Sequence, residues 1–313
     1  MKAVLLAAGK GVRLFPITKK LPKQMIKIAG KPILEYVIGD LAQNNFKDIC
    51  IVIGHENNPI KDYFGDGSKF GVKITYVLQN EPKGTAHATF IARDFVGNDE
   101  FLLYLADTII TEELSSFVKN LQTDFDIKII SSKVSKEKSD SVGKIHFKEG
   151  NIVTKISEKS TSDSVILAWA GIAFFKSNQI FEIIEKLAPS IRNEYEIVDA
   201  FNNFIDEGKK INQFQCNSFI DTGTVKGLLD LQKFLFKKIK SKYSEKYSPN
   251  MFIGDNCNIK NKFIIGPFVS IGNNVTIKND ITIQNSIIMD DVTINSNKII
   301  KDSILFDDYI IHL

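Results

Sequence analysis

The stretch Leu6-Ala7-Ala8-Gly9-Lys10-Gly11-Val12-Arg13-Leu14 continues an apolar run that begins at residue 3. An apolar run of this kind is typical of a strand that is buried on both faces in a parallel sheet. Gly9 and Gly11 let the backbone turn sharply and bring its N–H groups close to an anion. Arg13 adds a rigid fork of donors suited to phosphate oxygens. This stretch therefore predicts a phosphate-binding loop for a nucleoside triphosphate.

The composition indicates a globular chain with nearly balanced charge. The chain has 313 residues and 43% hydrophobic content, enough for a sizeable core and two domains. Its 40 basic and 37 acidic residues give a net charge of +3. So small an excess does not indicate nucleic acid or a membrane surface as a partner. We therefore expect small-molecule substrates, with no nucleic acid and no membrane.

The cysteines and the apolar runs favour a cytoplasmic protein. Cys50, Cys216 and Cys257 are an odd number at spacings that suit neither a disulfide framework nor a metal site. No apolar run approaches the roughly 18 residues of a membrane-spanning helix. The N-terminus also lacks the basic and apolar regions of a signal peptide.

Strand-like and helix-like segments alternate over the first part of the chain. The strand-like runs are residues 3–8, 49–53, 73–78, 101–105 and 126–131, and the helix-like stretches are residues 33–44, 86–95 and 112–121. This alternation predicts an α/β fold, a Rossmann-like mixed but mostly parallel sheet with helices on both faces. Short strands over residues 145–175 would extend the sheet. Ligands of such sheets bind at the carboxyl ends of the strands, where the glycine loop lies.

A six-residue repeat begins near residue 250. Isoleucine recurs at positions 253, 259, 265, 271, 277 and 283 and, after a one-residue slip, at 288, 294 and 300. Neither a helix nor a single strand has this period, whereas each side of a β-helix does. We predict a catalytic domain over residues 1–240 and a short left-handed parallel β-helix over residues 249–313; the alternative is the edge of a β-sandwich. Because so short a stack has exposed ends, we expect it to dock on the first domain or to form a homo-oligomer.

Two aspartates have surroundings that suit a metal site. Asp107 closes the predicted strand 101–105, so its carboxylate faces the same crevice as the glycine loop. Asp221 lies in the segment Phe-Ile-Asp-Thr-Gly-Thr. Two carboxylates near phosphates suit Mg²⁺, which prefers oxygen ligands. Each residue also has a structural interpretation, Asp107 as a helix N-cap and Asp221 as a turn residue.

Further polar residues follow other strand-like runs. Gln79 offers both a donor and an acceptor to a base edge, and Gly84 would let the backbone approach a nucleoside. The alternative is a plain loop capped by Thr85, with His87 as a packed or capping side chain. The adjacent Glu158 and Lys159 fit either a sugar phosphate or one exposed and one buried strand position.

Taken together, these motifs resemble those of the sugar-1-phosphate nucleotidyltransferases of the glucose-1-phosphate thymidylyltransferase and uridylyltransferase type. The family opening Leu-Ala-[Ala/Gly]-Gly-x-Gly-Thr-Arg-Leu-x-Pro-x-Thr is similar to residues 6–18. The resemblance continues at residues 22–25, 30–32, 64–68, 84–88, 194–199 and 221–224, and at Asp107, Glu158, Lys159 and Gly171. The repeats resemble the carboxyl-terminal β-helix of long archaeal and bacterial members.

The resemblance implies a role for each matching residue. Nucleotide binding would involve Leu6, Ala8, Gly9, Gly11, Gln79, Pro82 and Gly84, and binding of the sugar phosphate Gly143, Glu158, Lys159 and Gly171. The catalytic set would be Arg13, Lys23, Asp107 and Asp221, with the two aspartates on Mg²⁺. The implied activity is transfer of a nucleotidyl group from dTTP or UTP to a sugar 1-phosphate, glucose 1-phosphate being the first expectation.

Two substitutions keep alternatives open. Val12 replaces the usual threonine beside the triphosphate, and Val142 stands where an aromatic residue often precedes Gly143. These changes allow a catalytically weak regulatory paralogue that binds nucleotide sugar. N-acetylglucosamine 1-phosphate is an alternative acceptor. An acyltransferase role for the repeats is disfavoured, because no histidine lies within residues 253–300.

Overall fold

The computed structural model describes residues 1–54, 59–121, 125–135, 142–157, 165–239, 250–259, 263–295 and 298–313. The chain forms two compact units. The first consists of Met1–Gly9 and Val37–Phe219, and the second of Lys10–Tyr36 and Ile220–Leu313. The first strand and the loop that follows it therefore belong to different units. No helix within the described ranges is both long and apolar enough to span a membrane.

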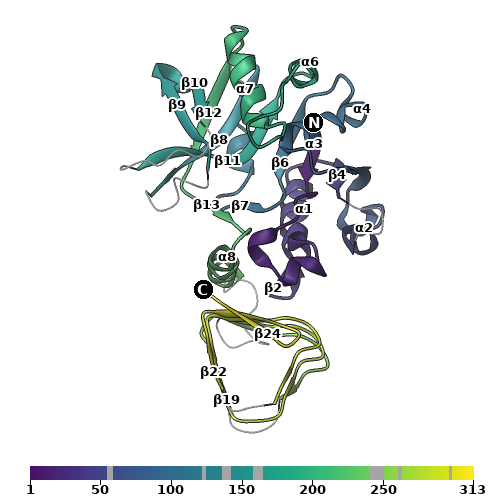
Figure 1. The fold of residues 1–313 in the computed structure, drawn as a ribbon, viewed down its shortest axis with the longest axis vertical. Coiled ribbons are helices and arrows are strands. Elements are labelled where there is room, and N and C mark those ends of the chain that lie inside the picture. Colours follow the sequence, from purple (N-terminus) through teal and green to yellow (C-terminus); the bar gives the residue numbers. More distant parts are fainter. Residues whose placement is uncertain are drawn as a thin grey trace. The chain divides into compact units, whose positions relative to one another are not determined.

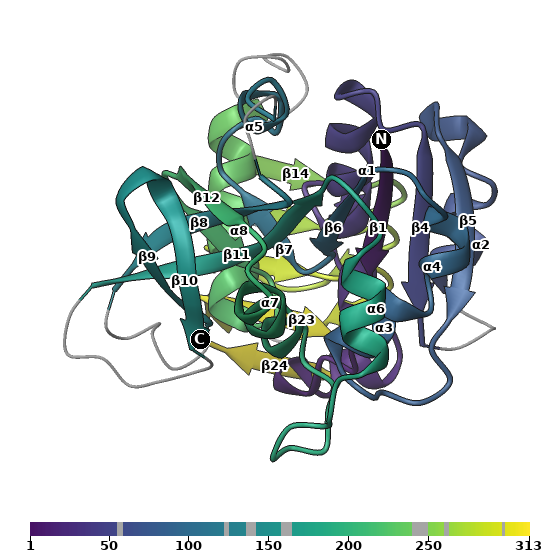
Figure 2. The ribbon, with the colours of Figure 1, turned by 90° about the horizontal axis from the view of Figure 1, so that it is seen from above.

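A nine-stranded mixed sheet forms the centre of the first unit (Figures 1 and 2). In spatial order its strands are β5 (Lys73–Leu78), β4 (Asp48–Ile53), β1 (Lys2–Leu6), β6 (Phe101–Leu105), β11 (Ile166–Phe175), β8 (Ile127–Val134), β12 (Ile211–Cys216), β10 (Ile152–Ser157) and β9 (Lys144–Lys148). Strands β5, β4, β1 and β6 are parallel, and β12 is parallel to β8. The other pairings are antiparallel.

The sheet confirms the α/β class but is less parallel than predicted. Strand β11 runs antiparallel to both β6 and β8, and β9 and β10 form an antiparallel pair. Hydrophobic runs identify buried strands without stating their direction. Direction depends instead on the connections, and the connections around residues 144–175 return the chain by antiparallel strands.

Short helices complete the first unit. They are α2 (Pro59–Phe64), α3 (Thr85–Phe90), α4 (Arg93–Val96), α5 (Ser115–Val118), α6 (Ile180–Glu185) and α7 (Ile197–Asp206), with short strand β7 (Thr108–Ile110) and 3₁₀ turns at Ser68–Phe70 and Glu149–Asn151. Helices α3, α6 and α7 contact one another over the sheet (Figure 2). The helix predicted over 86–95 is two helices, because the chain turns at Ile91 and Ala92. Helix α1 (Ile33–Gln43) agrees with the predicted helix over residues 33–44.

Aromatic packing closes the core of this unit. The rings of Phe101 on β6 and Phe175 on β11 stack with their centroids 4.4 Å apart. Phe201 of α7 packs on Phe175 and meets Trp169 edge-on at 5.4 Å. These four side chains are all at least nine-tenths buried. They fix the helix layer on the sheet and so set the frame from which the strand-end loops leave.

Three parallel sheets form the repeat region of the second unit. The first contains β14 (Met251–Ile253), β17 (Val269–Ile271), β20 (Ser286–Ile288), β23 (Ser303–Phe306) and the antiparallel β24 (Tyr309–His312). The second contains β15 (Asn258–Ile259), β18 (Thr276–Ile277) and β21 (Thr293–Ile294), and the third β16 (Phe263–Ile265), β19 (Ile281–Gln284) and β22 (Lys298–Lys301). Figure 1 shows them as the sides of a triangle.

The isoleucine repeat explains this triangle. Ile253 pairs with Ile271, which pairs with Ile288, and Ile259, Ile277 and Ile294 form the equivalent ladder on the next sheet. A side of six residues on three sheets returns the chain to the same position one coil later. The parallel stacking expected from the repeat is confirmed, while the left-handed sense of winding stays a prediction.

Asparagine and aspartate residues lie at the turns between successive strands of each coil. Asn256, Asn274 and Asp291 all have left-handed backbone conformations, with φ of 56°, 58° and 64°. Asn and Asp tolerate this region better than other side chains do. Asn274 Nδ2 also donates to Asp291 Oδ1 at 2.8 Å, which links successive coils at this corner.

The second unit also contains residues 10–36 and one long helix. Residues 10–36 form 3₁₀ turns at Val12–Leu14, Ile17–Lys19 and Lys23–Met25 and a hairpin of β2 (Lys27–Ile28) and β3 (Lys31–Pro32). The short strand β13 (Phe219–Asp221) leads to helix α8 (Val225–Ile239). Gln232 on α8 donates its amide to the carbonyl of Phe268 at 2.7 Å and so joins the helix to the coils. Residues 240–249, which lie between the two predicted domains, are outside the described residues.

Candidate active site

Four parallel strands bring several predicted site residues to one edge of the sheet. Leu6 pairs with Val52 on one side and with Leu105 on the other, so β4, β1 and β6 end at the same level. The N–H of Ala7 continues this pairing to the carbonyl of Val52 at 2.9 Å. Since β5 is in register with β4, its carboxyl end lies at the same edge. The loops that leave this edge carry Leu6, Ala8, Gly9, Gln79, Pro82, Gly84 and Asp107.

The side chain of Gln79 is held in one orientation by two neighbours. Gln79 is only 6% exposed. Its Nε2 donates to the carbonyl of Gly84 at 3.1 Å and lies 3.0 Å from His87 Nδ1. An amide nitrogen only donates, so the histidine ring accepts at Nδ1. Both amide hydrogens therefore have acceptors, and Oε1 is left as the acceptor of this side chain.

His87 is suited to this accepting role because it is half-buried. Burial is the main cause that lowers the pKa of His87 below its usual value, and the positive charge of Lys83 lowers it further. Glu81 opposes the shift, but its effect is the smallest of the three. At neutral pH the ring is therefore uncharged, with a free lone pair at Nδ1. The interpretation of His87 as a packed side chain is consistent with this contact, but its pairing with Gln79 was not foreseen.

Gly84 lies against the backbone of Tyr195. Its φ is +99°, and a Cβ at this position would lie 2.5 Å from the carbonyl oxygen of Tyr195. That same oxygen accepts the N–H of Ala86 at 2.8 Å, and the N–H of Tyr195 donates to the carbonyl of Lys83 at 2.8 Å. The loop after β5 is thus fixed by a backbone clamp that a side chain at position 84 would break.

Thr85 and Tyr195 connect the loop after β5 to the segment before α7, and neither contact was predicted. Thr85 Oγ1 accepts the N–H of Ile197, the first residue of α7, at 3.0 Å. Thr85 therefore caps a distant helix rather than its own. Tyr195 contributes its backbone N–H and carbonyl, and the identity of a residue does not indicate which contacts its backbone will make. The resemblance over residues 194–199 was the one signal that pointed to this segment.

Gly171 lies against the end of β6, which is close in sequence to Asp107. Asp107 follows this strand and is half-buried. Gly171 lies in an irregularity of β11 between Trp169 and Ala173, with a φ of +74°. A Cβ at Gly171 would lie 3.1 Å from Leu105 Cβ and 3.0 Å from Thr108 Oγ1. The bare glycine thus lets β11 approach the strand end that carries Asp107.

Gly143 is the second glycine predicted for the sugar, and it borders the same strand. Its carbonyl accepts the N–H of Trp169 at 3.0 Å. The indole of Trp169 in turn donates to the carbonyl of Ile172 at 3.0 Å across the irregularity in β11. Gly143 and Gly171 are therefore both fixed around Trp169. Glu158 and Lys159 lie outside the described residues.

In the second unit, Gly11 and Lys23 lie side by side. Gly11 has a φ of +63°, and its carbonyl accepts Thr18 Oγ1 at 2.7 Å. The stem of Lys23 passes 3.5 Å from the Cβ position of Gly11, and Lys23 is 9% exposed. Thr18 thus closes the glycine loop, although no role was predicted for it. Its only signal was the threonine at the end of the family opening.

Arg13 and Asp221 form an ion pair although 208 residues separate them. Arg13 Nη2 lies 3.1 Å from Asp221 Oδ2. The other oxygen, Asp221 Oδ1, accepts the N–H of Gly223 at 2.8 Å. Both side chains keep access to solvent, Arg13 at 51% and Asp221 at 35%. Val12, the neighbour of Arg13, is 59% exposed.

Each of the two aspartates predicted for Mg²⁺ offers oxygen donors of the kind that this ion prefers. Asp221 offers carboxylate oxygens at an accessible position in the second unit, and Asp107 does so in the first. Within the described ranges no group of three or more His, Cys, Asp or Glu side chains gathers as a metal site. Mg²⁺ is commonly held by one or two carboxylates with water and substrate phosphates, so it does not require such a group.

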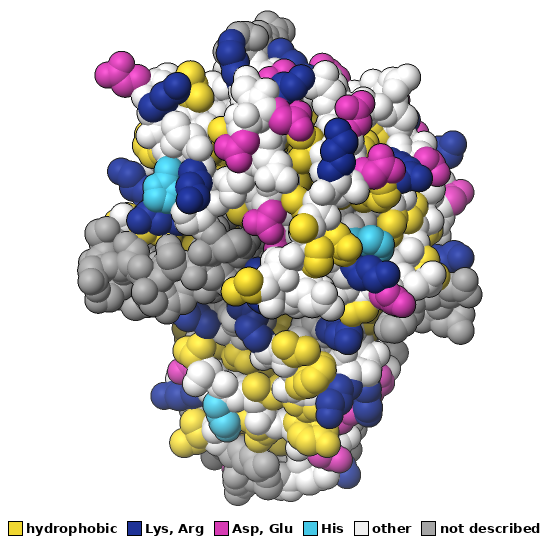
Figure 3. Space-filling model, turned by 45° about the horizontal axis from the view of Figure 1, so that its top comes forward, with side chains coloured by type: hydrophobic (Ala, Val, Ile, Leu, Met, Phe, Trp, Pro, Cys, Tyr) yellow, Lys and Arg dark blue, Asp and Glu magenta, His cyan; other side chains and the backbone are white. Residues whose placement is uncertain are grey.

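Figure 3 shows acidic and basic side chains interspersed over the face in view.

Comparisons with known proteins assign the chain to a family. The family model described as nucleotidyl transferase matches residues 2–238, and the GMPPB C-terminal domain matches residues 247–312. A low-salt glycan biosynthesis nucleotidyltransferase, Agl11 of Haloferax volcanii, is 37% identical over 240 residues, which cover 76% of this chain and 66% of that protein. The chain thus matches just under two thirds of this relative's length.

Two further proteins agree with this assignment. Glucose-1-phosphate thymidylyltransferase of Streptomyces griseus is 30% identical over 277 residues, covering 86% of this chain and 77% of that protein. A crystal structure of UDP-glucose pyrophosphorylase complexed with UDP-glucose has a TM-score of 0.66 and 26% identity, covering 76% of this chain and 98% of the other. The chain belongs to the nucleotidyl transferase family and carries a GMPPB-type C-terminal domain.

Proposed function

We propose that this chain transfers a nucleotidyl group from dTTP or UTP to a sugar 1-phosphate, with glucose 1-phosphate as the preferred acceptor, and releases pyrophosphate. The observation that carries the proposal is the shared edge of β1, β5 and β6, which gathers the nucleotide-binding motifs of the first unit. The thymidylyltransferase and UDP-glucose pyrophosphorylase relatives support the substrate class.

The reaction is a single in-line displacement. A phosphate oxygen of the sugar 1-phosphate attacks the α-phosphorus of the triphosphate, a new P–O bond forms, and the bond to the pyrophosphate leaving group breaks. The attacking phosphate is already anionic near neutral pH, so no strong general base is required. Catalysis then depends on positioning and on neutralising negative charge.

Cationic residues of the second unit would supply this neutralisation. Gly11 and Arg13 would bind the triphosphate, and Lys23 would stabilise the α-phosphate and the leaving pyrophosphate. The guanidinium of Arg13 already pairs with a carboxylate at 3.1 Å. A bound triphosphate would offer the same guanidinium stronger oxygen acceptors. Asp107 and Asp221 would hold Mg²⁺, which when bound offsets phosphate charge.

Gln79 would select the base. With both amide hydrogens directed at Gly84 and His87, its Oε1 can accept a hydrogen bond from a ring N–H. Uracil and thymine carry such an N–H on their pairing edge, whereas cytosine carries a bare nitrogen there. This chemistry favours UTP and dTTP over CTP. Leu6, Ala8 and Gly9 would contact the base, and Pro82 and Gly84 the nucleoside.

The sugar phosphate would bind at the residues around Trp169. Gly171 lets β11 approach the end of β6, Gly143 lies beside Ile156 and Val198, and Glu158 and Lys159 would contact the sugar hydroxyls and the phosphate. We further propose that residues 1–240 form the catalytic domain. The coils of residues 249–313 would wind as a left-handed β-helix and contribute to a homo-oligomer.

Product analysis and isotope exchange test this mechanism together. Incubation with Mg²⁺, dTTP or UTP and glucose 1-phosphate should yield one nucleoside diphosphate sugar by mass spectrometry. Labelled pyrophosphate should enter the triphosphate only when nucleotide sugar or sugar phosphate is present, because a single displacement forms no enzyme-bound nucleotide. Exchange in the absence of any sugar compound would indicate a covalent intermediate and contradict the proposal.

A further inference from the structure

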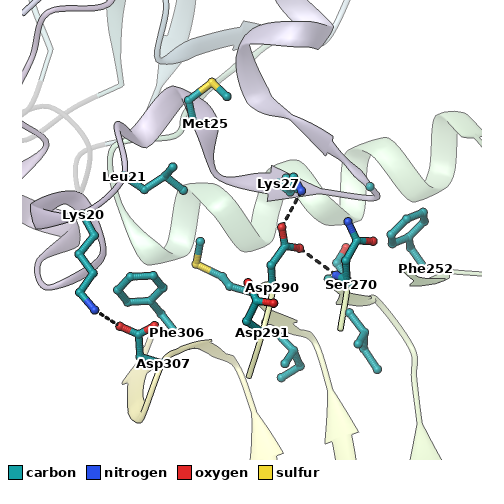
Figure 4. A pocket seen from close by; sticks show the side chains of 16 residues that line it. Lys20, Leu21, Met25, Lys27, Phe252, Ser270, Asp290, Asp291, Phe306 and Asp307 are labelled. Carbon is teal, nitrogen blue, oxygen red and sulfur yellow. Dashed lines mark hydrogen bonds and ion pairs between the residues drawn. The ribbon is translucent and has the colours of Figure 1, made fainter. Parts of the chain in front are cut away.

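The parallel coils of residues 250–313 contact residues 10–36, the segment that carries Gly11, Arg13 and Lys23. Lys27 Nζ lies 2.6 Å from Asp290 Oδ2 (Figure 4), and the N–H of Ala29 donates to Ser270 Oγ at 3.0 Å. Nearer the start of the segment, Lys20 Nζ lies 2.6 Å from Asp307 Oδ2. Residues 10–36 and the coils belong to one compact unit, so these contacts are internal to it.

The hairpin of β2 and β3 is shaped to its place on the coils. Ala29 and Gly30, at its turn, have φ of +49° and +84°, the conformation of a tight two-residue turn. The ring of Phe252 fills the space that a side chain at position 30 would occupy. The backbone of this turn therefore lies directly against β14 and β17.

Asp290 is itself fixed by the coil. Its Oδ1 accepts the N–H of Asn273 at 2.8 Å, which leaves Oδ2 for Lys27. The side chains of Lys27 and Asp290 are about one third exposed, at 34% and 32%. Such a partly exposed pair contributes modestly to stability, so its value lies in fixing geometry.

The contacts flank a cavity instead of forming a continuous packed interface. The cavity has a volume of about 390 Å³, and Leu21, Met25, Met289 and Phe306 are among the residues that line it (Figure 4). The segment is thus held at separate points around a cavity with a mixed polar and apolar lining. The polar contacts add to the packing of the buried Ile26 and Ile28 in determining how the segment sits.

Lys27 and Ala29, which contact the coils, lie close to Lys23 along the chain. Lys23–Met25 form a 3₁₀ turn whose first carbonyl accepts the N–H of Ile26 at 3.2 Å, and β2 begins at the next residue. A shift of Lys27 would therefore be passed on to Lys23 through a short hydrogen-bonded turn. The stem of Lys23 lies beside Gly11, so the glycine loop would move with it.

We propose that Asp290 and Ser270 are positioning residues that set the triphosphate-binding segment from the C-terminal coils. This inference rests on the proposed function, because it assigns Gly11, Arg13 and Lys23 to the triphosphate. It gives the coils a role in catalysis beyond assembly. These contacts affect binding of the triphosphate only, because the residues expected to bind the sugar 1-phosphate belong to the other unit.

Asp290→Asn in the full-length protein tests the proposal. Asparagine keeps an oxygen acceptor for the N–H of Asn273 but removes the charge that faces Lys27. We expect KM for the triphosphate to rise about three- to tenfold, with KM for the sugar 1-phosphate changed less than twofold. Lys27→Met should do the same, and the double variant should be no worse than either single one, because both remove one contact.

Asp302→Asn is the matched control. Asp302 is also an aspartate of the coils, but its side chain accepts from Asn285 of the neighbouring coil. It should leave both KM values unchanged. Unaltered KM for the triphosphate in Asp290→Asn and Lys27→Met would overturn the proposal, as would an equal rise for both substrates.

A measurement without turnover separates this proposal from the proposed function. Amide hydrogen exchange over residues 20–30 should be faster in Asp290→Asn than in the wild type, while Asp302→Asn matches the wild type. Unchanged exchange in Asp290→Asn would show that the coils do not hold the segment. An inactive wild-type protein with faster exchange in Asp290→Asn would count against the proposed function alone.

Discussion

A glutamine amide selects a base only when its neighbours fix which end faces the ligand. Here a backbone carbonyl and a neutral histidine take both hydrogens of Gln79, so in the proposed function its Oε1 would be the atom that accepts from the base. The same principle applies to Arg13, which Asp221 holds in place and which is proposed to bind the triphosphate. At this scale, specificity and charge placement come from the partners of the functional side chains.

Replacing His87 should weaken selection among bases. His87→Leu removes the acceptor for Gln79 Nε2 and lets the amide rotate, so kcat/KM for UTP and dTTP should fall about tenfold, the loss of roughly one hydrogen bond. Discrimination against CTP should fall with it. Steady-state kinetics with the three triphosphates measures both effects.

His312→Leu is the matched control, because His312 Nδ1 also makes one hydrogen bond, 2.9 Å from Ser303 Oγ in the coils. The wild type should also lose affinity for the triphosphate as the pH falls through the lowered pKa of His87, when Nδ1 becomes a donor. His87→Gln has an amide that does not titrate, so its KM should lack this acid limb. Base selection unchanged in His87→Leu would contradict the role of His87.

Removing the carboxylate of Asp107 should stop turnover while the fold is kept. If Asp107 is a ligand of Mg²⁺, Asp107→Ala should reduce kcat at least about a hundredfold with little change in the thermal midpoint. Asp99→Ala provides the comparison, because Asp99 forms an exposed ion pair with Lys2 at 2.8 Å. Full activity in Asp107→Ala would refute the metal role.

At the scale of elements, the sequence predicts position better than direction. The buried runs located β1, β4, β5 and β6, and α1 begins at the predicted residue. The antiparallel course of β11 was not predictable, because strand direction depends on contacts between distant segments. For the same reason the pairing of Arg13 with Asp221 could not be inferred, although both residues were singled out.

The irregularity in β11 gives a test at this scale. Gly171→Ala should destabilise the protein by about 1–3 kcal/mol and raise KM for the sugar 1-phosphate, because the new Cβ strains a positive φ and meets Leu105 and Thr108. Thermal unfolding and steady-state kinetics report the two effects.

Gly208→Ala separates strain from crowding. Its φ of +79° is similar, but nothing lies within 4 Å of its Cβ position. Gly208→Ala should therefore show only the backbone penalty and leave KM unchanged. Equal behaviour of the two variants would show that the approach of β11 to β6 does not shape the site.

At the scale of the molecule, the compact units do not follow chain order. Residues 10–36 belong with the C-terminal coils, although they follow the first strand of the sheet directly. The repeat period predicted the coils, and the resemblance predicted the residues of the loop. That the two meet depends on Lys27 and Ala29, which carry no motif, and on Gly30, whose match to the family did not predict this contact.

Truncation tests the importance of the coils for the whole protein. Removing residues 250–313 would expose Gln232 of α8 and the hairpin seated on Phe252 and Ser270. We expect aggregation or a smaller assembly, together with weaker triphosphate binding. Light scattering after size-exclusion chromatography measures the assembly, and calorimetry measures binding of the triphosphate. A soluble truncation with unchanged assembly and affinity would contradict a role of the coils in either.

Pyrophosphate release across a panel of substrates tests the central claim most directly. The wild-type chain with Mg²⁺ would be assayed with dTTP, UTP, CTP and ATP against glucose, N-acetylglucosamine, galactose and mannose 1-phosphates. The account predicts release with UTP or dTTP and at least one hexose 1-phosphate, little release with CTP, and none without a sugar phosphate. No release with any pair, or release independent of the sugar phosphate, would contradict it.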